Sequence, residues 1–216
     1  MYVLNFHGVG EPTRMLEEGE QDVWLSRSQF CEFLDVVINR SDVRLTFDDG
    51  NGSDVAIALP ELSKRNLKAC FFVCAGRLGA NGFLGRADVR SLQAAGMSIG
   101  SHGMEHVRWR KLNSAQVQQE IVQAKQALEH VTQTTIVEAA CPFGEYDRRS
   151  LQALREAGFK RVYTSDGGPA TNDDWLVARN TVRCCDSAES IQRMLSDSNK
   201  PVRFTHRAKR LIKQWR

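Results

Sequence analysis

Two pairs of titratable residues stand out because each pair follows a short apolar segment that is typical of a buried strand. Asp48 and Asp49 directly follow segment 43–47, and a similar segment precedes His102 and His106. Because side chains alternate in direction along a strand, we expect the two carboxylates to point different ways from the strand's end. Two histidines four residues apart lie on one face of a helical turn, within reach of one divalent cation. One carboxylate can then bind a metal while the other handles a proton.

Asp49 is the carboxylate that we expect to share a metal site with His102 and His106. Two imidazoles and one carboxylate leave coordination positions open for water and substrate, as a catalytic metal site requires. We expect Zn2+, although Co2+, Ni2+ or Fe2+ would also suit these ligands. Each motif has an ordinary alternative when it stands alone. Residues 48–50 match an Asp-Gly turn, and the histidines match two unrelated surface residues.

The elements that must position these residues alternate between strand and helix along the chain. This alternation implies an α/β fold with parallel strands joined by right-handed crossovers. In such sheets and barrels, sites assemble in the loops after the carboxyl ends of the strands, where the candidate residues fall. Apolar runs predict strands at 2–6, 43–47, 69–74, 97–100, 135–141 and 161–164. Helical spacing and capping residues predict helices at 26–37, 53–65, 86–95, 115–131 and 148–157.

The composition is that of an ordinary globular protein, since 42% of the 216 residues are hydrophobic and 25% are charged. We expect one domain over residues 1–199 and exclude a disordered chain, collagen and a coiled coil. The net charge of +3 is too balanced to indicate nucleic-acid binding. The six cysteines form no CxxC pair, which favours reduced thiols without a structural zinc site. The chain has no long apolar run and no secretory signal, so we expect a cytoplasmic protein.

The last segment, residues 200–216, differs in composition from the rest. It contains seven basic residues and no acidic one, with Leu211, Ile212 and Trp215 interleaved. This pattern predicts a basic amphipathic helix that docks its apolar side chains on the body of the protein. The alternative is contact with an anionic membrane surface, which would make the protein peripheral to a membrane.

Three motifs occur in order along the chain: Thr46-Phe47-Asp48-Asp49-Gly50, Ser101-His102-Gly103-Met104-Glu105-His106 and Pro142-Phe143-Gly144. Together they resemble the motifs of the NodB-type polysaccharide deacetylases, carbohydrate esterase family 4. The resemblance covers residues 1–182 and implies that residues 1–199 form a single-domain distorted (β/α) barrel. It also implies a divalent metal and hydrolysis of N-acetyl groups on amino sugars of a poly- or oligosaccharide. The alternatives are hydrolysis of another C–N bond on a small amide, or a homologue that binds metal or glycan with weak catalysis.

By this resemblance, Asp49, His102 and His106 correspond to the metal triad of the family and Asp48 to its catalytic base. The third motif of the family begins with an arginine that tethers the base, two residues before the proline. This chain has Ala140 at that position. Another basic side chain would therefore have to hold the base in place.

The general acid that the resemblance implies is a histidine at the end of an apolar strand. His7 follows the apolar segment 2–6 and is our candidate, with His206 as the alternative. A first strand that carries this histidine is similar to the arrangement in circularly permuted members of the family, such as the poly-N-acetylglucosamine deacetylases. We therefore expect this chain to be a permuted member.

Four more residues complete the expected site. Asp166 resembles the aspartate of the fourth motif and would orient a neighbouring residue such as the acid histidine, unless it is an exposed turn residue. The resemblance suggests that a backbone N–H at Phe143 or Gly144 helps to hold the oxyanion. Trp175 would line the sugar pocket, because aromatic faces stack on sugar rings, unless it is a core residue.

Overall fold

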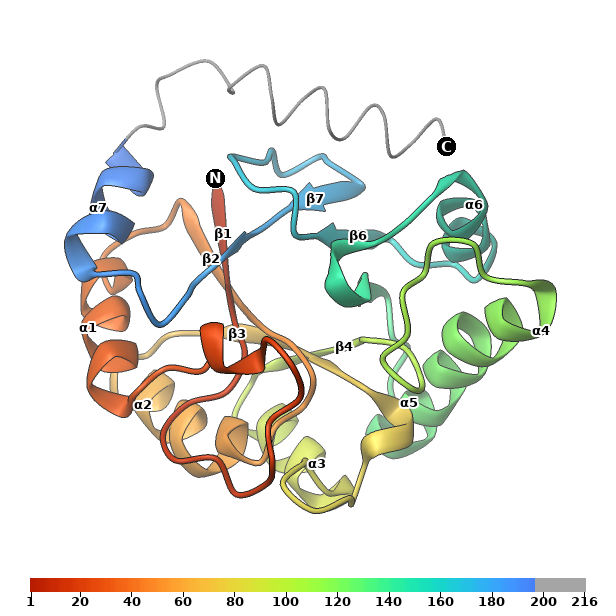
Figure 1. The fold of residues 1–216 in the computed structure, drawn as a ribbon, viewed down its shortest axis with the longest axis horizontal. Coiled ribbons are helices and arrows are strands. Elements are labelled where there is room, and N and C mark those ends of the chain that lie inside the picture. The colour runs from red at the N-terminus through yellow and green to blue at the C-terminus, as the bar shows by residue number, and fades with distance from the viewer. Residues whose placement is uncertain (197–216) are drawn as a thin grey trace.

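Eight parallel strands form a barrel that is surrounded by helices, as Figure 1 shows. The computed structural model describes residues 1–196, so the segment 200–216 and His206 lie outside the described residues. The strand order is β7-β6-β5-β4-β3-β2-β1-β8, and every pairing is parallel. The strands are β1 (Tyr2–Phe6), β2 (Val43–Phe47), β3 (Ala69–Val73), β4 (Ser98–Ser101), β5 (Glu138–Ala140), β6 (Arg161–Thr164), β7 (Leu176–Ala178) and β8 (Asn180–Thr181).

The helices cover the outside of the barrel, and all except α7, which follows β8, lie in the connections between the strands. The α-helices are α1 (Arg27–Val37), α2 (Leu59–Lys64), α3 (Arg86–Ala94), α4 (Ser114–Val117), α5 (Ala124–Thr132), α6 (Arg148–Glu156) and α7 (Ala188–Ser196). Two π-helical stretches, η2 (Asp54–Ala58) and η4 (Gln118–Gln123), continue into α2 and α5. Three 3-10 turns complete the set: η1 (Glu20–Asp22), η3 (Ala75–Arg77) and η5 (Pro142–Gly144).

One extended segment, residues 176–181, closes the barrel. Its first half, β7, pairs with β6, and its second half, β8, pairs with β1. Arg179 lies between the two halves, and its backbone N–H donates to Thr164 O at 3.0 Å. The first and last strands of the described chain thus lie next to each other, which places the loops after β1 and β8 at one end of the barrel.

The core has two layers, because strands β1 to β7 each bury residues on both faces, as parallel strands usually do. The outer layer packs the strands against the helices and includes the stacked rings of Phe47 and Phe71, whose centroids are 4.6 Å apart. The inner layer fills the barrel. Its apolar members are Val3, Cys70, Phe72, Ala140, Tyr163 and Val177, with Ala170 at the edge.

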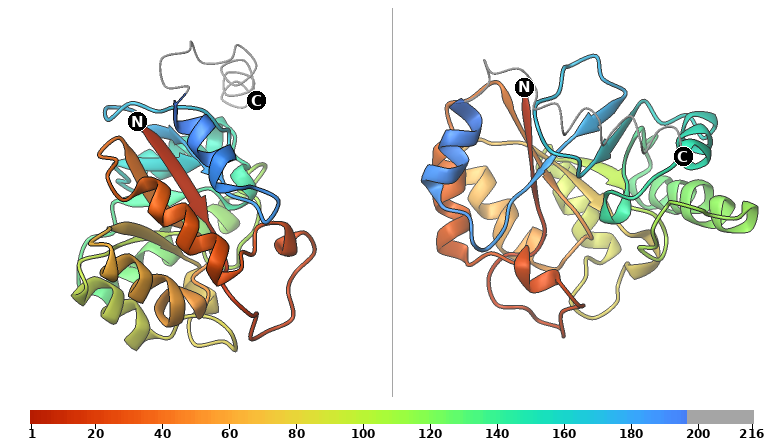
Figure 2. Two further views of the ribbon diagram at one scale, coloured as in Figure 1. Left: turned by 90° about the vertical axis from the view of Figure 1, so that its left-hand side faces the viewer. Right: turned by 45° about the horizontal axis from the view of Figure 1, so that its top comes forward.

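The helix that follows the β1 loop begins where its capping residues predict. Ser26 caps α1 by accepting from the Gln29 N–H, and Gln29 in turn accepts from the Ser26 N–H. Such a reciprocal cap satisfies two otherwise unpaired amide groups. α7 packs beside α1, as Figure 2 shows from two sides. The end of the described chain is therefore attached next to the first helix.

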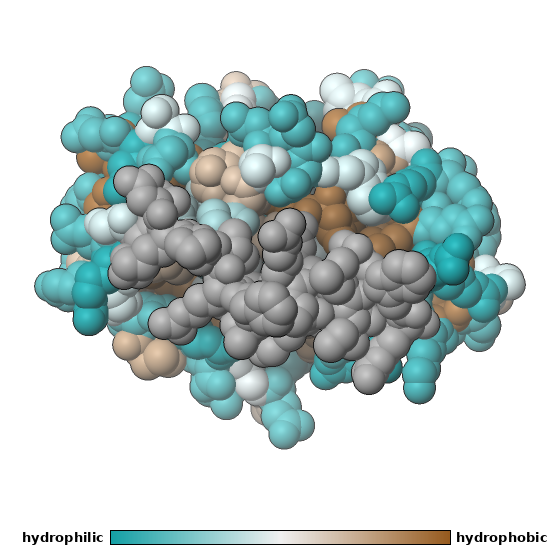
Figure 3. Space-filling model, turned by 90° about the horizontal axis from the view of Figure 1, so that it is seen from above, coloured by the Kyte–Doolittle hydropathy of each residue, from teal (hydrophilic) through white to brown (hydrophobic). Residues whose placement is uncertain are grey.

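The described surface in Figure 3 is mostly hydrophilic, with hydrophobic side chains showing in patches between polar ones. Within residues 1–196, the exposed large hydrophobic side chains are Met15, Ile38, Val137 and Phe143. No helix in this part of the chain is long and apolar enough to cross a membrane. Of the four exposed side chains, only Phe143 lies in the loop of one of the three motifs.

Candidate active site

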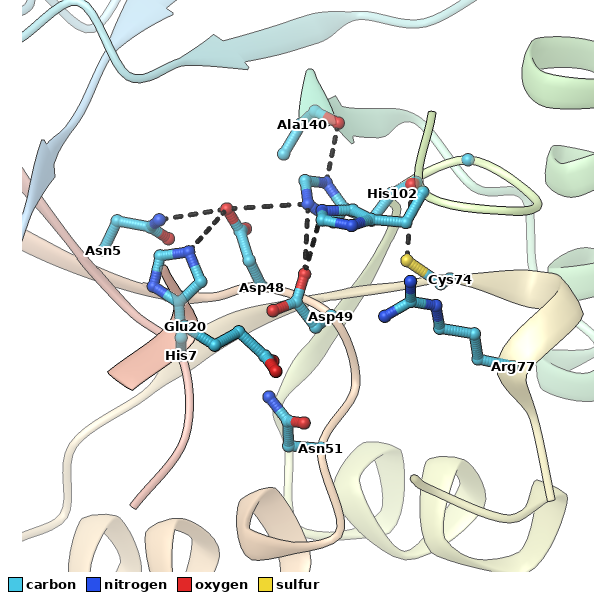
Figure 4. A network of polar contacts seen from close by, with 12 residues as sticks. Asn5, His7, Glu20, Asp48, Asp49, Asn51, Cys74, Arg77, His102 and Ala140 are labelled. Atoms are coloured by element: carbon cyan, nitrogen blue, oxygen red, sulfur yellow. Dashed lines mark hydrogen bonds and ion pairs between the residues drawn. The ribbon is translucent and has the colours of Figure 1, made fainter. Parts of the chain in front are cut away.

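Asp48 and Asp49 follow β2 and point in different directions, as the alternation along a strand predicts. Both are 3% exposed. Figure 4 shows Asp48 directed toward Asn5 and His7, and Asp49 directed toward His102. The backbone of Asp49 has a φ of 76°, which is uncommon for a residue other than glycine. The sharp turn after the strand keeps both carboxylates in one pocket, where His102 is the neighbour that they share.

His102 and His106 come to one side of Asp49. The Asp49 Oδ1 atom is 3.5 Å from His102 Nε2 and 3.3 Å from His106 Nε2. His102 Nδ1 lies 2.9 Å from the Ala140 carbonyl oxygen, which orients the ring. Burial lowers the pKa of His102 to about 4, although Asp48 and Asp49 act to raise it. His102 is therefore neutral near pH 7, which leaves a lone pair on a ring nitrogen for a metal.

The prediction that His102 and His106 lie on one helical turn is wrong. Residues 102–107 form a loop, with φ angles of +84° at Gly103 and +56° at His106. Glu120 holds this loop, because its buried carboxylate accepts from the N–H groups of Met104 at 2.9 Å and Glu105 at 3.2 Å. Since a side chain from the next helical element satisfies these amides, the loop brings both imidazoles to Asp49 without forming a helix.

Gly103 offers a test of this loop. A Cβ atom at position 103 would lie 2.7 Å from Glu120 Oε2, whereas a Cβ at Gly158, which has a similar φ of +79°, meets nothing within 4 Å. We expect Gly103→Ala and Gly158→Ala to lose about 1 kcal/mol each from the strained φ. Only Gly103→Ala should also weaken zinc binding, by about tenfold. Equal zinc affinities for the two variants, measured by chelator competition, would contradict this role of the loop.

The Asp49, His102 and His106 cluster fits a divalent cation. Its ligand atoms all lie within 4.8 Å of one another. Bonds of about 2.0–2.1 Å at tetrahedral angles separate ligand atoms by about 3.4 Å, close to the two measured distances. The Asp49 Oδ1 atom is buried and has no hydrogen-bond partner among residues 1–196. An unpaired buried carboxylate oxygen is costly, so a cation at this position would satisfy it.

Asp48 is held by Arg179, which had no part in the expected site. Arg179 Nη1 donates to Asp48 Oδ1 at 2.6 Å and Nη2 donates to Oδ2 at 2.7 Å. Asn5 Nδ2 also donates to Oδ2, at 2.9 Å. Burial acts to raise the pKa of Asp48, but the charges of Arg179 and His102 outweigh it and hold the pKa far below its usual range. Asp48 is therefore ionised and fixed in orientation.

Arg179 is a basic side chain from elsewhere in the chain that holds Asp48, as the absence of an arginine at position 140 required. Its guanidinium is fully buried and lies over the rings of Phe72, at 5.3 Å, and Tyr163, at 5.9 Å. Ala140 belongs to the same inner cluster as these two rings. The small side chain at position 140 thus accompanies an arginine that enters the barrel from the junction of β7 and β8 instead of from β5. The apolar residues before Arg179 could have marked a strand, but nothing in the sequence relates it to Asp48.

His7 lies beside Asp48, at the end of β1. Its Nε2 atom is 4.0 Å from Asp48 Oδ2, and its side chain is 17% exposed. Its Nδ1 atom is buried and has no hydrogen-bond partner within the described residues. The structure thus brings His7 together with Asp48 and the Asp49, His102 and His106 cluster, whereas His206 lies outside the described residues. The permutation that the position of His7 suggested stays a prediction.

Asp166 is buried at the end of β6 and is not an exposed turn residue. It accepts hydrogen bonds from the Tyr146 hydroxyl at 2.7 Å and from the Thr164 hydroxyl at 2.9 Å. These bonds fix the carboxylate in place. Its role in orienting the acid histidine stays a prediction.

Phe143 and Gly144 form the turn η5 beside the histidines. The Phe143 ring is half exposed, and its centroid lies 4.4 Å from that of the His106 ring. The Gly144 N–H already donates to Cys141 O at 2.9 Å. Of the two amides that the resemblance suggested for the oxyanion, Phe143 is therefore the better candidate.

Trp175 is not brought to this site. It directly precedes β7 and so lies at the amino end of that strand, while the site is at the carboxyl ends. Its Nε1–H donates to Phe159 O at 2.9 Å, and the Arg155 guanidinium lies 4.1 Å from its ring centroid. Trp175 is a packing residue, and Phe143 is the aromatic side chain at the mouth of the pocket.

The pocket over these residues has a volume of about 380 Å3. Its floor is made by His7, Asp48, Asp49 and the two histidines of the cluster. One wall comes from the loop between β1 and α1, and the other includes Phe143, Arg108 and Arg183. A pocket of this size is at the lower end of the range for small ligands and suits a group such as one sugar unit.

Asp54 is a fully buried carboxyl group near this pocket. Neither of its side-chain oxygens has a hydrogen-bond partner within residues 1–196. Burial raises its pKa well above the usual value, and the charges of Asp49 and Asp48 raise it further. The folded protein therefore keeps the proton of Asp54 at pH values where the unfolded chain loses it.

We expect Asp54→Asn to stabilise the metal-free protein more at pH 7.5 than at pH 4.5. A raised pKa in the folded state means that folding loses stability as the pH rises from the ordinary value of 3.8 toward the folded-state pKa. Asparagine has a similar shape and does not ionise. The melting temperature of the Asp54→Asn variant should exceed that of the wild type by about 2–4 °C at pH 7.5, which corresponds to about 1 kcal/mol of stability. A difference that does not grow with pH would contradict the burial of an unpaired carboxyl.

The fold and site define a parallel α/β barrel with a possible cation site at the carboxyl ends of its strands. The family model for polysaccharide deacetylase matches residues 37–162, which is more than half of the chain. The chain belongs to the polysaccharide deacetylase family.

Two relatives and one solved structure illustrate the similarity. The chain is 30% identical over 143 residues to the putative polysaccharide deacetylase YxkH of Bacillus subtilis, covering 65% of this chain and 50% of that protein. It is 26% identical over 125 residues to a chitooligosaccharide deacetylase of Azorhizobium caulinodans, covering 57% and 58%. The chain thus spans between one half and two thirds of the length of these relatives. The fold matches Streptococcus pyogenes deacetylase PplD with a TM-score of 0.78 at 19% identity, covering 90% and 97% of the two chains.

Proposed function

We propose that this protein is a metal-dependent N-deacetylase that removes acetyl groups from the amino sugars of a poly- or oligosaccharide. The proposal rests on the observation that three kinds of chemical group line one pocket. A cation-binding cluster, an ionised carboxylate at Asp48 and an imidazole at His7 all line it. Membership of the polysaccharide deacetylase family supports an acetylated sugar as the substrate.

Asp49, His102 and His106 would hold the divalent cation, and the mixed nitrogen and oxygen ligands favour Zn2+ with Co2+, Ni2+ or Fe2+ as alternatives. When bound, such a cation polarises the amide carbonyl and makes a water molecule more acidic. The neutral state of His102 suits this role, because the cation needs the free lone pair of an imidazole.

Asp48 would accept the proton of the attacking water. Arg179 and Asn5 fix both oxygens of the carboxylate, so that it does not need to reorient during the reaction. Asp48 Oδ2 is also 3.8 Å from His102 Nε2, and this short distance to the cluster supports Asp48 as the base. The Arg179 charge keeps Asp48 ionised, and a carboxylate must be ionised to act as a base.

His7 would donate a proton to the departing amine nitrogen. Cleavage of an amide needs such an acid, because the free amide anion is a poor leaving group. The Phe143 N–H would help to stabilise the charge on the former carbonyl oxygen. Asp166 would contribute by fixing a neighbouring residue. The products would be acetate and a free amino sugar.

The test is acetate release from N-acetylglucosamine, from its oligomers of two to six units and from N-methylacetamide, with equal concentrations of acetamide groups. We expect zinc-dependent release that is faster for the oligomers. Faster release from N-methylacetamide would favour the alternative of a small-amide hydrolase. Binding of the oligomers without release, at full zinc occupancy, would favour a glycan-binding homologue and contradict the proposed catalysis.

We also propose, from composition alone, weak contact of residues 200–216 with an anionic membrane surface on the cytoplasmic side, as the alternative to docking of their apolar side chains on the body of the protein. Their seven basic residues would bind anionic lipid headgroups. Cosedimentation of the full chain with vesicles of 30% phosphatidylserine at low salt tests this. Equal recovery with neutral vesicles would contradict it.

A further inference from the structure

The loop between β1 and α1 forms one wall of the pocket and is anchored by Arg14, a partly buried residue whose side chain is 8% exposed. Arg14 donates to Glu20 and, at 2.8 Å, to Asn51 Oδ1, which lies two residues after Asp49. The Arg14 guanidinium also lies 4.4 Å from the centroid of the Phe83 ring. These contacts attach the loop to the segment that carries the carboxylate of the cluster. The position of the loop is therefore coupled to the position of the site.

Glu17 connects this loop to His106. Its Oε1 atom accepts from Arg77 Nη2 at 2.7 Å, and its Oε2 atom is 4.0 Å from His106 Nδ1. The Nε2 atom of the same ring faces Asp49 Oδ1. The Nδ1 atom is buried and has no hydrogen-bond partner in the described part of the chain. Glu17 therefore presents a carboxylate to the ring nitrogen that the metal cluster does not use.

A histidine that binds a metal through one nitrogen usually donates the proton of its other nitrogen to an acceptor, which fixes the ring and makes it a stronger ligand. His102 has such an acceptor in the Ala140 carbonyl, at 2.9 Å. That acceptor belongs to β5, a strand of the barrel. The only charged acceptor facing His106 Nδ1 among residues 1–196 is the carboxylate of Glu17, on a loop that lines the pocket.

We infer that Glu17 is a positioning residue that orients His106 and sets the affinity of the site for its cation. The inference rests on the metal centre of the proposed function. In the metal-bound protein, Glu17 accepts the Nδ1 proton of His106 while Nε2 faces the cation. Arg77 holds Glu17 from the other side, so the chain of contacts runs from Arg77 through Glu17 to His106. The wall of the substrate pocket thereby contributes to the metal centre.

The test is zinc affinity, measured by competition with a chromogenic chelator for the full-length chain and independent of any substrate. Glu17→Met keeps the length of the side chain and removes the acceptor, and it should raise the Kd for zinc by about 10- to 100-fold. Glu17→Gln keeps an oxygen that can accept from Nδ1, so its Kd should fall between those of the wild type and Glu17→Met. Glu18→Met is the matched control, since Glu18 lines the same pocket one residue away.

The control should bind zinc within about twofold of the wild type, and the metal-free melting temperatures of all three variants should agree within about 2 °C. Equal Kd values for Glu17→Met and Glu18→Met would overturn the inference, whether both are normal or both are raised. A normal Kd in Glu17→Met together with zinc-dependent acetate release by the wild type would leave the proposed function standing. Absence of zinc binding by the wild type would overturn the metal centre and this inference together.

Discussion

The Asp48→Asn variant is expected to bind zinc like the wild type but to release acetate about 10²- to 10⁴-fold more slowly, the contribution that a general base usually makes. Asparagine keeps the shape of the side chain and can still accept a hydrogen bond from Asn5 or Arg179. It cannot accept the proton of the attacking water. The loss should therefore appear in kcat, measured by acetate release at saturating substrate.

Two measurements separate loss of the base from loss of the site. The zinc content of Asp48→Asn should stay at one ion per chain, whereas Asp49→Asn, which removes a cluster ligand, should lose both zinc and activity. The melting temperature should fall in Asp48→Asn, because Arg179 is left buried without its anionic partner. Turnover near that of the wild type in a zinc-loaded Asp48→Asn variant would rule out Asp48 as the base.

Replacing Arg179 with methionine is expected to lower both stability and turnover. Asp48 would remain in the barrel without the two hydrogen bonds from the guanidinium, and breaking a buried ion pair in this way costs about 3–5 kcal/mol. For a chain of this length, that is a fall of about 6–20 °C in the melting temperature. Turnover should fall by about 100-fold or more, because a misplaced group can cost that much. Thermal unfolding and acetate release measure the two effects.

A second variant distinguishes positioning of Asp48 from general damage to the core. Ala140 belongs to the same inner cluster as Phe72 and Tyr163, the two rings over which the Arg179 guanidinium lies. Ala140→Arg in the Arg179→Met background should therefore return a guanidinium to the neighbourhood of Asp48 and recover part of the turnover. Ala140→Arg alone should destabilise the protein, since two arginines cannot share this space. Equal turnover by Arg179→Met and the wild type would contradict the tethering role.

Much of the barrel could be predicted from the sequence, because apolar segments and capping residues are local signals. The strands at 2–6 and 43–47 have the predicted bounds, and the helix at 26–37 begins after its Ser26 cap. The strands β7 and β8 were not predicted. They contain three and two residues, and the polar residues Arg179 and Asn180 interrupt the apolar run that would have marked one strand.

As with the barrel, one part of the candidate site could be predicted from local sequence motifs, and the other part depends on contacts that the fold creates. The motifs predicted the cluster around Asp49, but spacing alone suggested a helical turn for His102 and His106. The buried carboxylate of Glu120, 16 residues after Met104 and outside both motifs, holds the loop instead. Arg179 is 131 residues from Asp48, so only the closure of the barrel brings them together. Contacts of this kind depend on the fold and leave no spacing pattern in the sequence.

Trp175 shows the limit of interpreting a residue type without its position. An aromatic side chain near the end of residues 1–182, the region that resembles the family, is a reasonable candidate for a sugar contact. The direction of β7 decides against it, because Trp175 enters the strand at the end of the barrel opposite the site. Phe143 was expected to act through its backbone, and the structure adds a half-exposed ring at the mouth of the pocket.

The central claim is that the protein releases acetate only when one divalent cation is held by Asp49, His102 and His106, with Asp48 as the base. The most direct measurement is a titration of the chelator-treated protein with Zn2+, with acetate release from N-acetylglucosamine oligomers recorded at each step. We predict negligible release without metal, and a linear rise in activity that ends at one equivalent of zinc per chain. Full turnover by the metal-free protein, or no turnover at one bound zinc per chain, would contradict the account.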